Sequence, residues 1–219
     1  MSTRLAVFDC DGTLVDSQAN ICRAMEHAFA TLALPAPPRP AVRAIVGLSL
    51  VEAMALLAPE LGTAAHLALT DAYKTTFRRM REDGELDAEP LYDGLVAALD
   101  ALAADGWMLG IATGKSDRGL AHVLALHGLT RRFVTLQTAD RHPSKPHPAM
   151  LHAAMAEAGA VPHMTAMIGD TSFDMAMARA AGVRAVGVTW GYHREAALWS
   201  AGAQAMAQRC ADLPACLAA

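Results

Sequence analysis

Apolar residues recur along this chain with two different spacings, and the change between them divides it into two parts. Residues 5–8 are apolar throughout and are followed at once by carboxylates, which is typical of a short strand buried on both faces. Between residues 18 and 88 the apolar positions follow the period of a helix instead, and no strand pattern is found. This segment predicts a helical unit that is long enough for a small bundle. Its helices are expected over 18–32, 41–46, 49–58 and 64–81, with the proline-rich stretch 35–40 ending the first.

From residue 89 onward, strand and helix patterns alternate. Strands are expected over 107–113, 133–137, 165–168 and 184–188. Helices are expected over 91–104, 118–127, 147–158 and 172–180. This alternation predicts a parallel, doubly wound (Rossmann-like) sheet with helices on both faces. The strand at 5–8 has no partner nearby in sequence, so it must join this sheet.

The expected fold class is therefore α/β, with an all-helical domain inserted after the first strand. We assign residues 1–17 and 89–219 to the sheet-containing core and residues 18–88 to the helical domain. A chain of this length can bury one sizeable core together with a small satellite domain.

Composition narrows the class of protein without deciding its function. Of the 219 residues, 53% are hydrophobic and 18% are charged, as in a globular protein. The net charge of −4 argues against a general nucleic-acid binder, which would need a basic patch. The four cysteines suggest no disulfide framework, and the apolar run before Asp9 is too short for a signal peptide or a membrane span. We expect a cytoplasmic protein, monomeric or homodimeric, that binds neither nucleic acid nor membrane.

Two carboxylates, Asp9 and Asp11, directly follow the first strand. In an extended segment they would project from one side of the backbone, and Gly12 then permits a turn. Ligands of such sheets bind at the carboxyl ends of the strands, so carboxylates crowded there need a cation or a titration role. For an isolated Asp-x-Asp pair, a solvated acidic turn would be a sufficient explanation.

Later strands also end in polar groups. Thr113 and Gly114 offer a hydroxyl and an approachable backbone amide, both donors for a phosphate oxygen, although a capped turn accounts for them equally well. Lys145 lies between prolines, which stiffen its loop, and a solvated surface lysine would not need such restraint. If it lies beside the acids, its charge would neutralise carboxylate and phosphoryl groups. Asp170 ends a strand, and Asp174 lies one helical turn later. The helix dipole explains one such acid but not the Gly-Asp pair at the end of a buried strand.

Taken together, these residues resemble the motifs of the haloacid dehalogenase superfamily, specifically its phosphatase branch that includes phosphoglycolate phosphatases. The first motif is the string Asp-x-Asp-Gly-Thr-Leu-Val-Asp-Ser that begins at Asp9. Thr113, Lys145 and the pair Asp170 and Asp174 follow in the family's order. The resemblance covers essentially the whole chain, and it implies that the helical insertion is a cap domain.

The resemblance also implies a role for each acid. It makes Asp9 the nucleophile that forms an aspartyl phosphate, and Asp11 the general acid and base. It places Mg²⁺ on the Asp9 carboxylate, the Asp11 main-chain carbonyl and Asp170. Asp174 would position Lys145 or a metal-bound water.

The remaining motif residues would bind the substrate. Thr113, Gly114 and Lys145 would hold the transferring phosphoryl group. The cap would close over the site and exclude water. Its candidates for contacting the rest of the substrate are Arg43, Gly47 and Ser49. For Arg43, a solvated helix charge remains the alternative.

The function expected from the resemblance is Mg²⁺-dependent hydrolysis of a small phosphomonoester, a small phosphorylated metabolite for which 2-phosphoglycolate is the nearest analogy. A phosphosugar mutase resembling β-phosphoglucomutase and an inorganic pyrophosphatase of the same fold remain alternatives. Dehalogenase chemistry would need neither Asp11 nor the metal residues. A catalytically silent binding module would have no need for the complete set of acid, hydroxyl and lysine positions.

Overall fold

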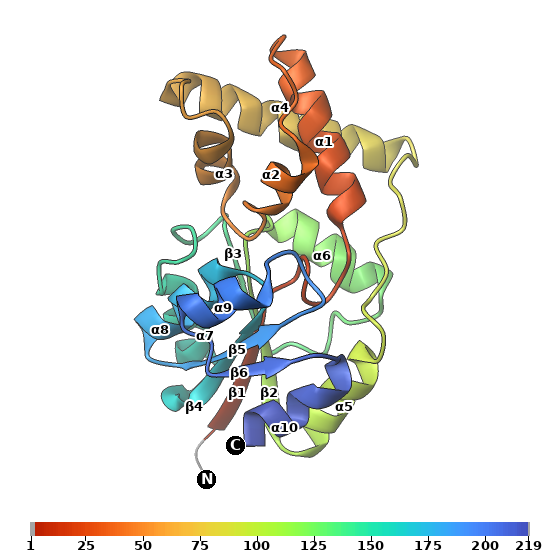
Figure 1. Ribbon diagram of the computed structural model, residues 1–219. Helices are drawn as coiled ribbons and strands as arrows, with labels where there is room; N and C mark the ends of the chain where they lie inside the picture. Colours follow the sequence, from red (N-terminus) through yellow and green to blue (C-terminus); the bar gives the residue numbers. More distant parts are fainter. Residues whose placement is uncertain (1–2, 219) are drawn as a thin grey trace.

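The computed structural model describes residues 3–218, and in this part of the chain a parallel sheet lies below a group of four helices (Figure 1). The strand order is β3-β2-β1-β4-β5-β6, and every neighbouring pair is parallel. The strands are β1 (Thr3–Phe8), β2 (Trp107–Thr113), β3 (Thr135–Thr138), β4 (Ala160–Gly169), β5 (Arg184–Val188) and β6 (Ala205–Ala207). The predicted doubly wound α/β sheet is thereby confirmed, with β1 paired to β2 on one side and to β4 on the other.

Helices cover both faces of the sheet, and β1 supplies side chains to each. Ala6 and Phe8 belong to the hydrophobic cluster on one face, whereas Leu5 and Val7 belong to the cluster on the other, as the two-residue period of a strand requires. The first face is covered by α5 (Leu95–Ala104), α6 (Asp117–Leu126) and α10 (Leu213–Ala218). The second is covered by α7 (Ala149–Ala158), α8 (Ser172–Ala181) and α9 (Glu195–Ala201). These four strand residues are fully buried, so the carboxyl end of β1 is held from both sides.

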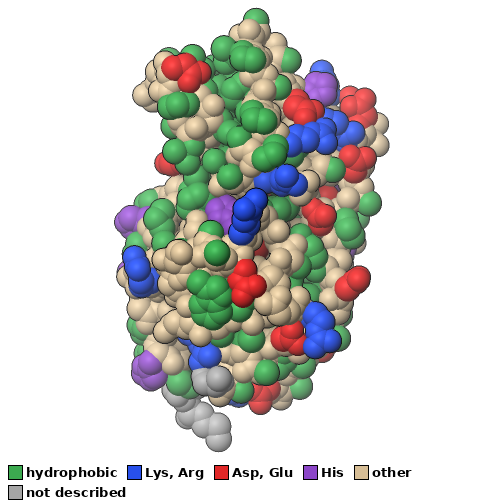
Figure 2. Space-filling model, in the orientation of Figure 1, with side chains coloured by type: hydrophobic (Ala, Val, Ile, Leu, Met, Phe, Trp, Pro, Cys, Tyr) green, Lys and Arg blue, Asp and Glu red, His purple; other side chains and the backbone are tan. Residues whose placement is uncertain are grey.

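Four helices form a separate unit, which makes the upper lobe of the molecule in Figures 1 and 2. They are α1 (Gln18–Thr31), α2 (Arg39–Arg43), α3 (Leu50–Leu57) and α4 (Thr63–Glu82). Their apolar faces meet in a third hydrophobic cluster, in which Met25, Met54 and Leu69 are buried. As predicted, the described residues between 18 and 88 contain no strand. The exact division of the chain at residues 17/18 and 88/89 into domains stays a prediction.

The chain enters and leaves this helical unit at one place. Val15 and Leu91 form an antiparallel bridge, and the backbone N–H of Asp16 donates to the carbonyl of Pro90 over 3.0 Å. Just beyond them, the Asn20 side chain donates to the carbonyl of Asp87 at 3.0 Å and accepts from its N–H at 2.9 Å. The two connections therefore run side by side and are joined by hydrogen bonds.

Several boundaries differ from the sequence predictions. Helix α2 spans Arg39–Arg43 rather than 41–46: Pro38 is extended and precedes it, Pro40 fits its first turn, and turns replace its expected end. Strand β4 begins at Ala160 rather than at 165; its first residues are largely exposed and lack a buried strand's pattern. Beyond residue 188 no element was predicted, yet α9, β6, a 3₁₀ turn (Cys210–Asp212) and α10 are present there. Strand β6 has only three residues, too few to produce a period.

Among residues 3–218, no helix combines the length and the apolar character that a membrane crossing requires.

Candidate active site

The predicted motif residues follow four different elements but meet at the carboxyl edge of the sheet. Asp9 follows β1, Thr113 ends β2, and Lys145 lies in the loop between β3 and α7. Asp170 directly follows β4, and Asp174 lies in the first turn of α8. Because the sheet is parallel, these strand ends share one edge. The sheet order reverses its direction between β1 and β4, and ligands of doubly wound sheets bind at such a point.

Lys145 is a fully buried cation that lies between two carboxylates. Its ammonium nitrogen Nζ is 2.9 Å from Oδ1 of Asp9 and 2.7 Å from Oδ1 of Asp174. Burial alone would lower the pKa of Lys145, but the charges of Asp174 and Asp9 outweigh it and raise the pKa above its ordinary value. The lysine is therefore charged, and it offsets part of the negative charge of the two acids.

The Asp9 carboxylate is buried without a complete set of partners. Apart from the ion pair with Lys145, neither of its oxygens has a hydrogen-bond partner among the described residues. Burial, reinforced by the Asp174 charge and opposed by the Lys145 charge, raises the pKa of Asp9 to about 7. A buried carboxylate with free oxygens is expected to bind a ligand, because leaving it unpaired is unfavourable.

Asp170 is held in place by the chain around it. Its Oδ1 accepts from the Thr13 hydroxyl at 2.8 Å and its Oδ2 accepts from the Tyr192 backbone N–H at 2.8 Å. Burial and the neighbouring Asp9 charge raise its pKa well above the usual value. Gly12 and Gly191 lie so close to the Asp170 side chain that a Cβ on Gly12 would be 2.3 Å from its Oδ2, and a Cβ on Gly191 would be 2.2 Å from its Cβ. Only a residue without a side chain fits at these two positions.

Three of the acids are arranged as a divalent cation would require. Asp9, Asp170 and Asp174 each offer a carboxylate oxygen, and these three atoms lie within 4.8 Å of one another. Mg²⁺ prefers oxygen ligands and usually retains several waters, and the free oxygens of Asp9 would supply such ligands. The donor set therefore fits the cation. It brings the side chain of Asp174 into the cluster; the expected contribution of the Asp11 carbonyl stays a prediction.

Asp174 has partners for both oxygens without a metal. Its Oδ2 accepts from the backbone N–H of Thr171 at 3.0 Å and from the Thr171 hydroxyl at 2.7 Å. These bonds are part of a capping box at the start of α8. The helix terminus therefore fixes the carboxylate that pairs with Lys145; the supporting role of Asp174 in the reaction stays a prediction.

Asp11 has different partners from Asp9, because the strand ends at Phe8 and the chain turns immediately afterwards. Its Oδ1 lies 2.8 Å from the Nζ of Lys115, and it accepts a hydrogen bond from the hydroxyl of Ser17. Asp11 also lines a cavity between the helical unit and the sheet. Both acids follow β1 directly, as expected, but their carboxylates have separate partners: Asp9 pairs with Lys145 and Asp11 with Lys115.

The loop of the helical unit that contains Gly47 and Ser49 lies against the motif loops. A Cβ on Gly114 would lie 2.6 Å from the Leu48 carbonyl oxygen and 2.7 Å from that of Gly47. The backbone N–H of Ser49 donates to the Ser144 hydroxyl over 2.8 Å. Gly114 therefore permits close contact between the helical unit and the core. The structure brings Gly47 to the edge of the site and Ser49 to the lysine loop.

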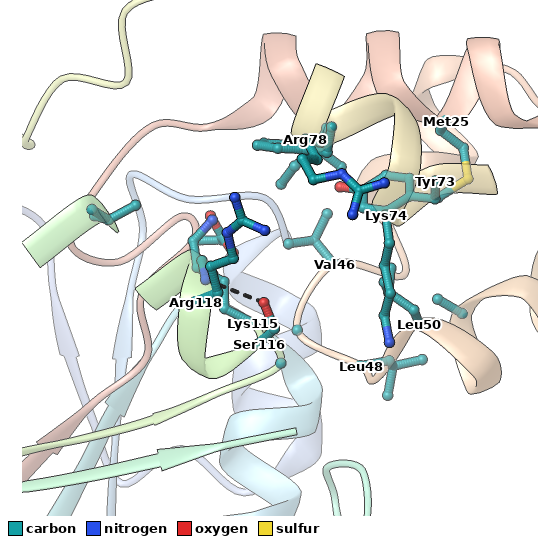
Figure 3. Close-up of a pocket in the computed structure, with 18 of the residues that line it drawn as sticks. Met25, Val46, Leu48, Leu50, Tyr73, Lys74, Arg78, Lys115, Ser116 and Arg118 are labelled. Carbon is teal, nitrogen blue, oxygen red and sulfur yellow. Dashed lines mark hydrogen bonds and ion pairs between the residues drawn. The ribbon is translucent and has the colours of Figure 1, made fainter. Parts of the chain in front are cut away.

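The cavity between the two lobes has a volume of about 310 Å³. Figure 3 shows Tyr73 and Arg78 of α4 on one side, and Lys115, just before α6, with Arg118 of α6 on the other. Arg43, which was expected to contact the substrate, lies in the last turn of α2 and is not among the residues lining this cavity.

Sequence reasoning did not select several residues that complete the site. Lys115 follows Thr113 and Gly114 at a strand end, so its position was a usable signal for a charge at the site. Thr13 and Tyr192 reach Asp170 from parts of the chain that are far apart in sequence, and no local pattern marks them.

Comparison with known proteins agrees with this geometry. The family model described as haloacid dehalogenase-like hydrolase matches residues 6–188 of this chain, which include every motif residue named above. This chain belongs to the haloacid dehalogenase-like hydrolase family. The resemblance found in the sequence is thereby confirmed, and so is the expectation of an enzyme of the hydrolase class.

Relatives within this family are similar over most of their length. The probable phosphatase IndB of Dickeya dadantii is 38% identical over 86% of this hydrolase and 82% of the relative. The phosphoglycolate phosphatase of Rhodospirillum rubrum is 34% identical over 88% of this chain and 82% of the length of that phosphatase. A solved hydrolase from Pseudomonas syringae has the same fold, with a TM-score of 0.85 and 24% sequence identity. The match covers 99% of this chain and 98% of the solved chain.

Proposed function

We propose that this hydrolase is a Mg²⁺-dependent phosphatase that removes the phosphoryl group from a small phosphorylated metabolite through an aspartyl phosphate on Asp9. The observation that carries the proposal is the buried Asp9 carboxylate, whose oxygens have no hydrogen-bond partner and which lies beside Lys145 and the Asp170 carboxylate. The printed names of the relatives, a probable phosphatase and phosphoglycolate phosphatases, support the same chemistry.

Asp9 and Asp11 divide the reaction between them. An Asp9 oxygen attacks phosphorus and the bond to the leaving oxygen breaks, while Asp11 gives its proton to that oxygen. In the second half, Asp11 takes a proton from a water, whose oxygen attacks the phosphorus and releases phosphate from Asp9. The Lys115 ion pair and the Ser17 hydroxyl hold Asp11 at the cavity in its ionised form, which is the form that would take the proton from water in the second half and be protonated again for the next first half.

The surrounding residues supply positive charge and hydrogen bonds to the phosphoryl group. Three clustered carboxylates share one lysine before a phosphate dianion is added, so the site needs a further cation. Mg²⁺ held by Asp9, Asp170 and the Asp11 carbonyl would neutralise phosphoryl charge. Lys145 and the hydroxyl of Thr113, together with the Gly114 amide, would bind the transferring oxygens.

The helical unit would act as the cap of this phosphatase. Its core is separate from those of the sheet, and its loop at Gly47 and Ser49 rests on Gly114 and Ser144. In this position it covers the site and keeps water from the first step. We infer that residues 18–88 move as a cap domain on the paired connections at Val15 and Leu91.

The experiment is a phosphate-release assay on benzyl phosphate and 2-phosphoglycolate, with EDTA and then with excess Mg²⁺. We expect no release in EDTA and recovery on adding Mg²⁺, without any sugar bisphosphate present. Undiminished release in EDTA would contradict the metal requirement. Release only from pyrophosphate, or only when a sugar bisphosphate is added, would favour the pyrophosphatase or the mutase instead.

A further inference from the structure

The cavity beside Asp11 has one apolar wall, which comes mainly from the helical unit. Met25 of α1, Val46 of the loop before α3, and Tyr73 and Phe77 of α4 line it. Tyr73 and Phe77 are one helical turn apart, so both rings lie on the same face of α4, with their centroids 5.8 Å apart. Rings paired in this way present a surface suited to another ring or to an aliphatic body.

The size of the cavity exceeds what a two-carbon leaving group would fill. Its volume of about 310 Å³ lies at the lower end of the range of about 300–1,000 Å³ found for pockets that bind drug-sized ligands. The phosphoryl group itself would lie beyond this space, at Asp9 and Lys145, neither of which lines the cavity. The volume is thus available to the leaving group.

The cavity is also rich in cations, although the protein as a whole is acidic. Five basic residues line it, against two acidic ones, Asp11 and Glu89, while the whole chain carries −4. The basic residues are Lys74, Arg78, Arg81, Lys115 and Arg118. Of these five, Lys115 already forms a close ion pair, with its Nζ 2.8 Å from Oδ1 of Asp11.

The remaining cations have few partners among residues 3–218. Lys74 and Arg78 form no ion pair there, and Arg118 reaches only Glu82, at 4.0 Å. The buried Nε of Arg81 has no hydrogen-bond partner. Burial, and then the like charge of Arg118, lower the pKa of Arg81. An anion in this cavity would relieve that repulsion.

Arg78 and Arg118 approach the space from opposite lobes. Arg78 extends from α4 in the helical unit and Arg118 from α6 in the core, and Figure 3 shows them on opposite sides of the cavity. Guanidinium groups placed in this way suit a carboxylate or a phosphate, because each guanidinium can donate two parallel hydrogen bonds to such an anion.

We propose that the substrate's leaving group combines a ring-sized apolar body, packed against Val46, Tyr73 and Phe77, with an anionic group bound between Arg78 and Arg118. This inference rests on the proposed phosphatase function and narrows its substrate class. It also separates this enzyme from one built for 2-phosphoglycolate, whose leaving group has an anion but no apolar body.

Four phosphomonoesters test the two features independently. Ethyl phosphate has neither, benzyl phosphate has the ring, 2-phosphoglycolate has the anion, and 4-carboxybenzyl phosphate has both. All four release a primary alcohol, which keeps their intrinsic reactivity similar. We expect the highest kcat/KM for 4-carboxybenzyl phosphate, with the ring contributing about tenfold over ethyl phosphate and the carboxylate roughly fivefold over benzyl phosphate.

Two variants of neighbouring arginines locate the anion site. Arg78→Gln should bring the ratio of kcat/KM for 4-carboxybenzyl phosphate to that for benzyl phosphate close to one. Arg79→Gln is the matched control, because Arg79 lies next along α4, is exposed and does not line the cavity; the ratio should stay at its original value. Phe77→Ala should likewise lower the ratio of kcat/KM for benzyl phosphate to kcat/KM for ethyl phosphate.

The outcomes distinguish the two proposals. A preference for 2-phosphoglycolate over 4-carboxybenzyl phosphate, or an Arg78→Gln ratio equal to that of the parent, would overturn the substrate class and leave the phosphatase proposal standing. If none of the four esters released phosphate with Mg²⁺ present, the phosphatase proposal would fail, and this inference with it.

Discussion

Replacing Lys145 by methionine should destabilise the protein strongly even when no substrate or metal is present. Methionine has a similar length but no charge, so the substitution removes the cation without leaving a large cavity. Asp9 and Asp174 would then remain buried, with the ammonium that lies 2.9 Å and 2.7 Å from them gone. Without the lysine, the nearest charges to Asp9 would be those of the other acids.

The size of the effect follows from the burial of the ion pairs. Removing one partner of a buried ion pair costs about 3–5 kcal/mol, because the other partner is left charged and unsolvated. For a chain of this length, this loss corresponds to a fall in Tm of about 6–20 °C. Lys74→Met serves as the control, since Lys74 is exposed and forms no ion pair within residues 3–218; its effect should stay within about 0.5 kcal/mol.

Thermal and urea unfolding in EDTA would measure both variants, and a double-mutant cycle would identify the cause. Asp174→Asn removes the negative charge and retains an oxygen that can accept from the Thr171 N–H. In the Lys145→Met background, Asp174→Asn should therefore cost less than it does in the parent, with an interaction energy of about 0.5–3 kcal/mol. Strictly additive effects, or a Lys145→Met variant as stable as Lys74→Met, would refute the argument.

Three further predictions concern turnover and cap closure. Asp9→Asn should abolish phosphate release, because no aspartyl phosphate can form; steady-state release near the parent rate would contradict its role as nucleophile. Asp11→Asn should lower kcat by roughly 10²–10⁴-fold, and a smaller effect in the same assay would leave general acid catalysis to another group. Gly114→Ala should lower kcat/KM for every ester, because its Cβ would lie 2.6 Å from the Leu48 carbonyl and hold the lobes apart. Gly62→Ala, at the N-cap of α4, is its control, because a Cβ there would meet no atom within 4 Å; kcat/KM should stay at the parent value and the stability should change by only a few tenths of a kcal/mol.

Much of the fold could be predicted because the relevant patterns are local. Five of the six strands, β1 to β5, were expected to end within one residue of where they do, since a buried strand that stops at a polar residue is marked by its own sequence. The segment after Val188 was not predicted. There the sheet edge is completed by β6, whose pairing depends on β5 rather than on any period of its own.

The same distinction applies to the site. Asp9, Lys145, Asp170 and Asp174 could be selected because each lies at or near the end of an element that the sequence predicts. No local pattern shows that Lys145 lies between Asp9 and Asp174, because Lys145 and Asp174 are twenty-nine residues apart along the chain; only the family resemblance suggested that they pair. The cavity was missed for a related reason. The residues of α4 that line it repeat at helical spacing, but only the tertiary arrangement shows which face of the helix meets the core.

The paired connections at Val15 and Leu91 have a consequence for how this architecture diversifies. Because both ends of the helical segment leave the sheet at one place and are joined there, the segment spans a gap that any chain with closely spaced ends could bridge. The entropy of closing such a gap rises only slowly with the length of the insert. Lineages could therefore exchange or enlarge the insert, and so change the compounds an organism can process, while inheriting the reaction centre intact.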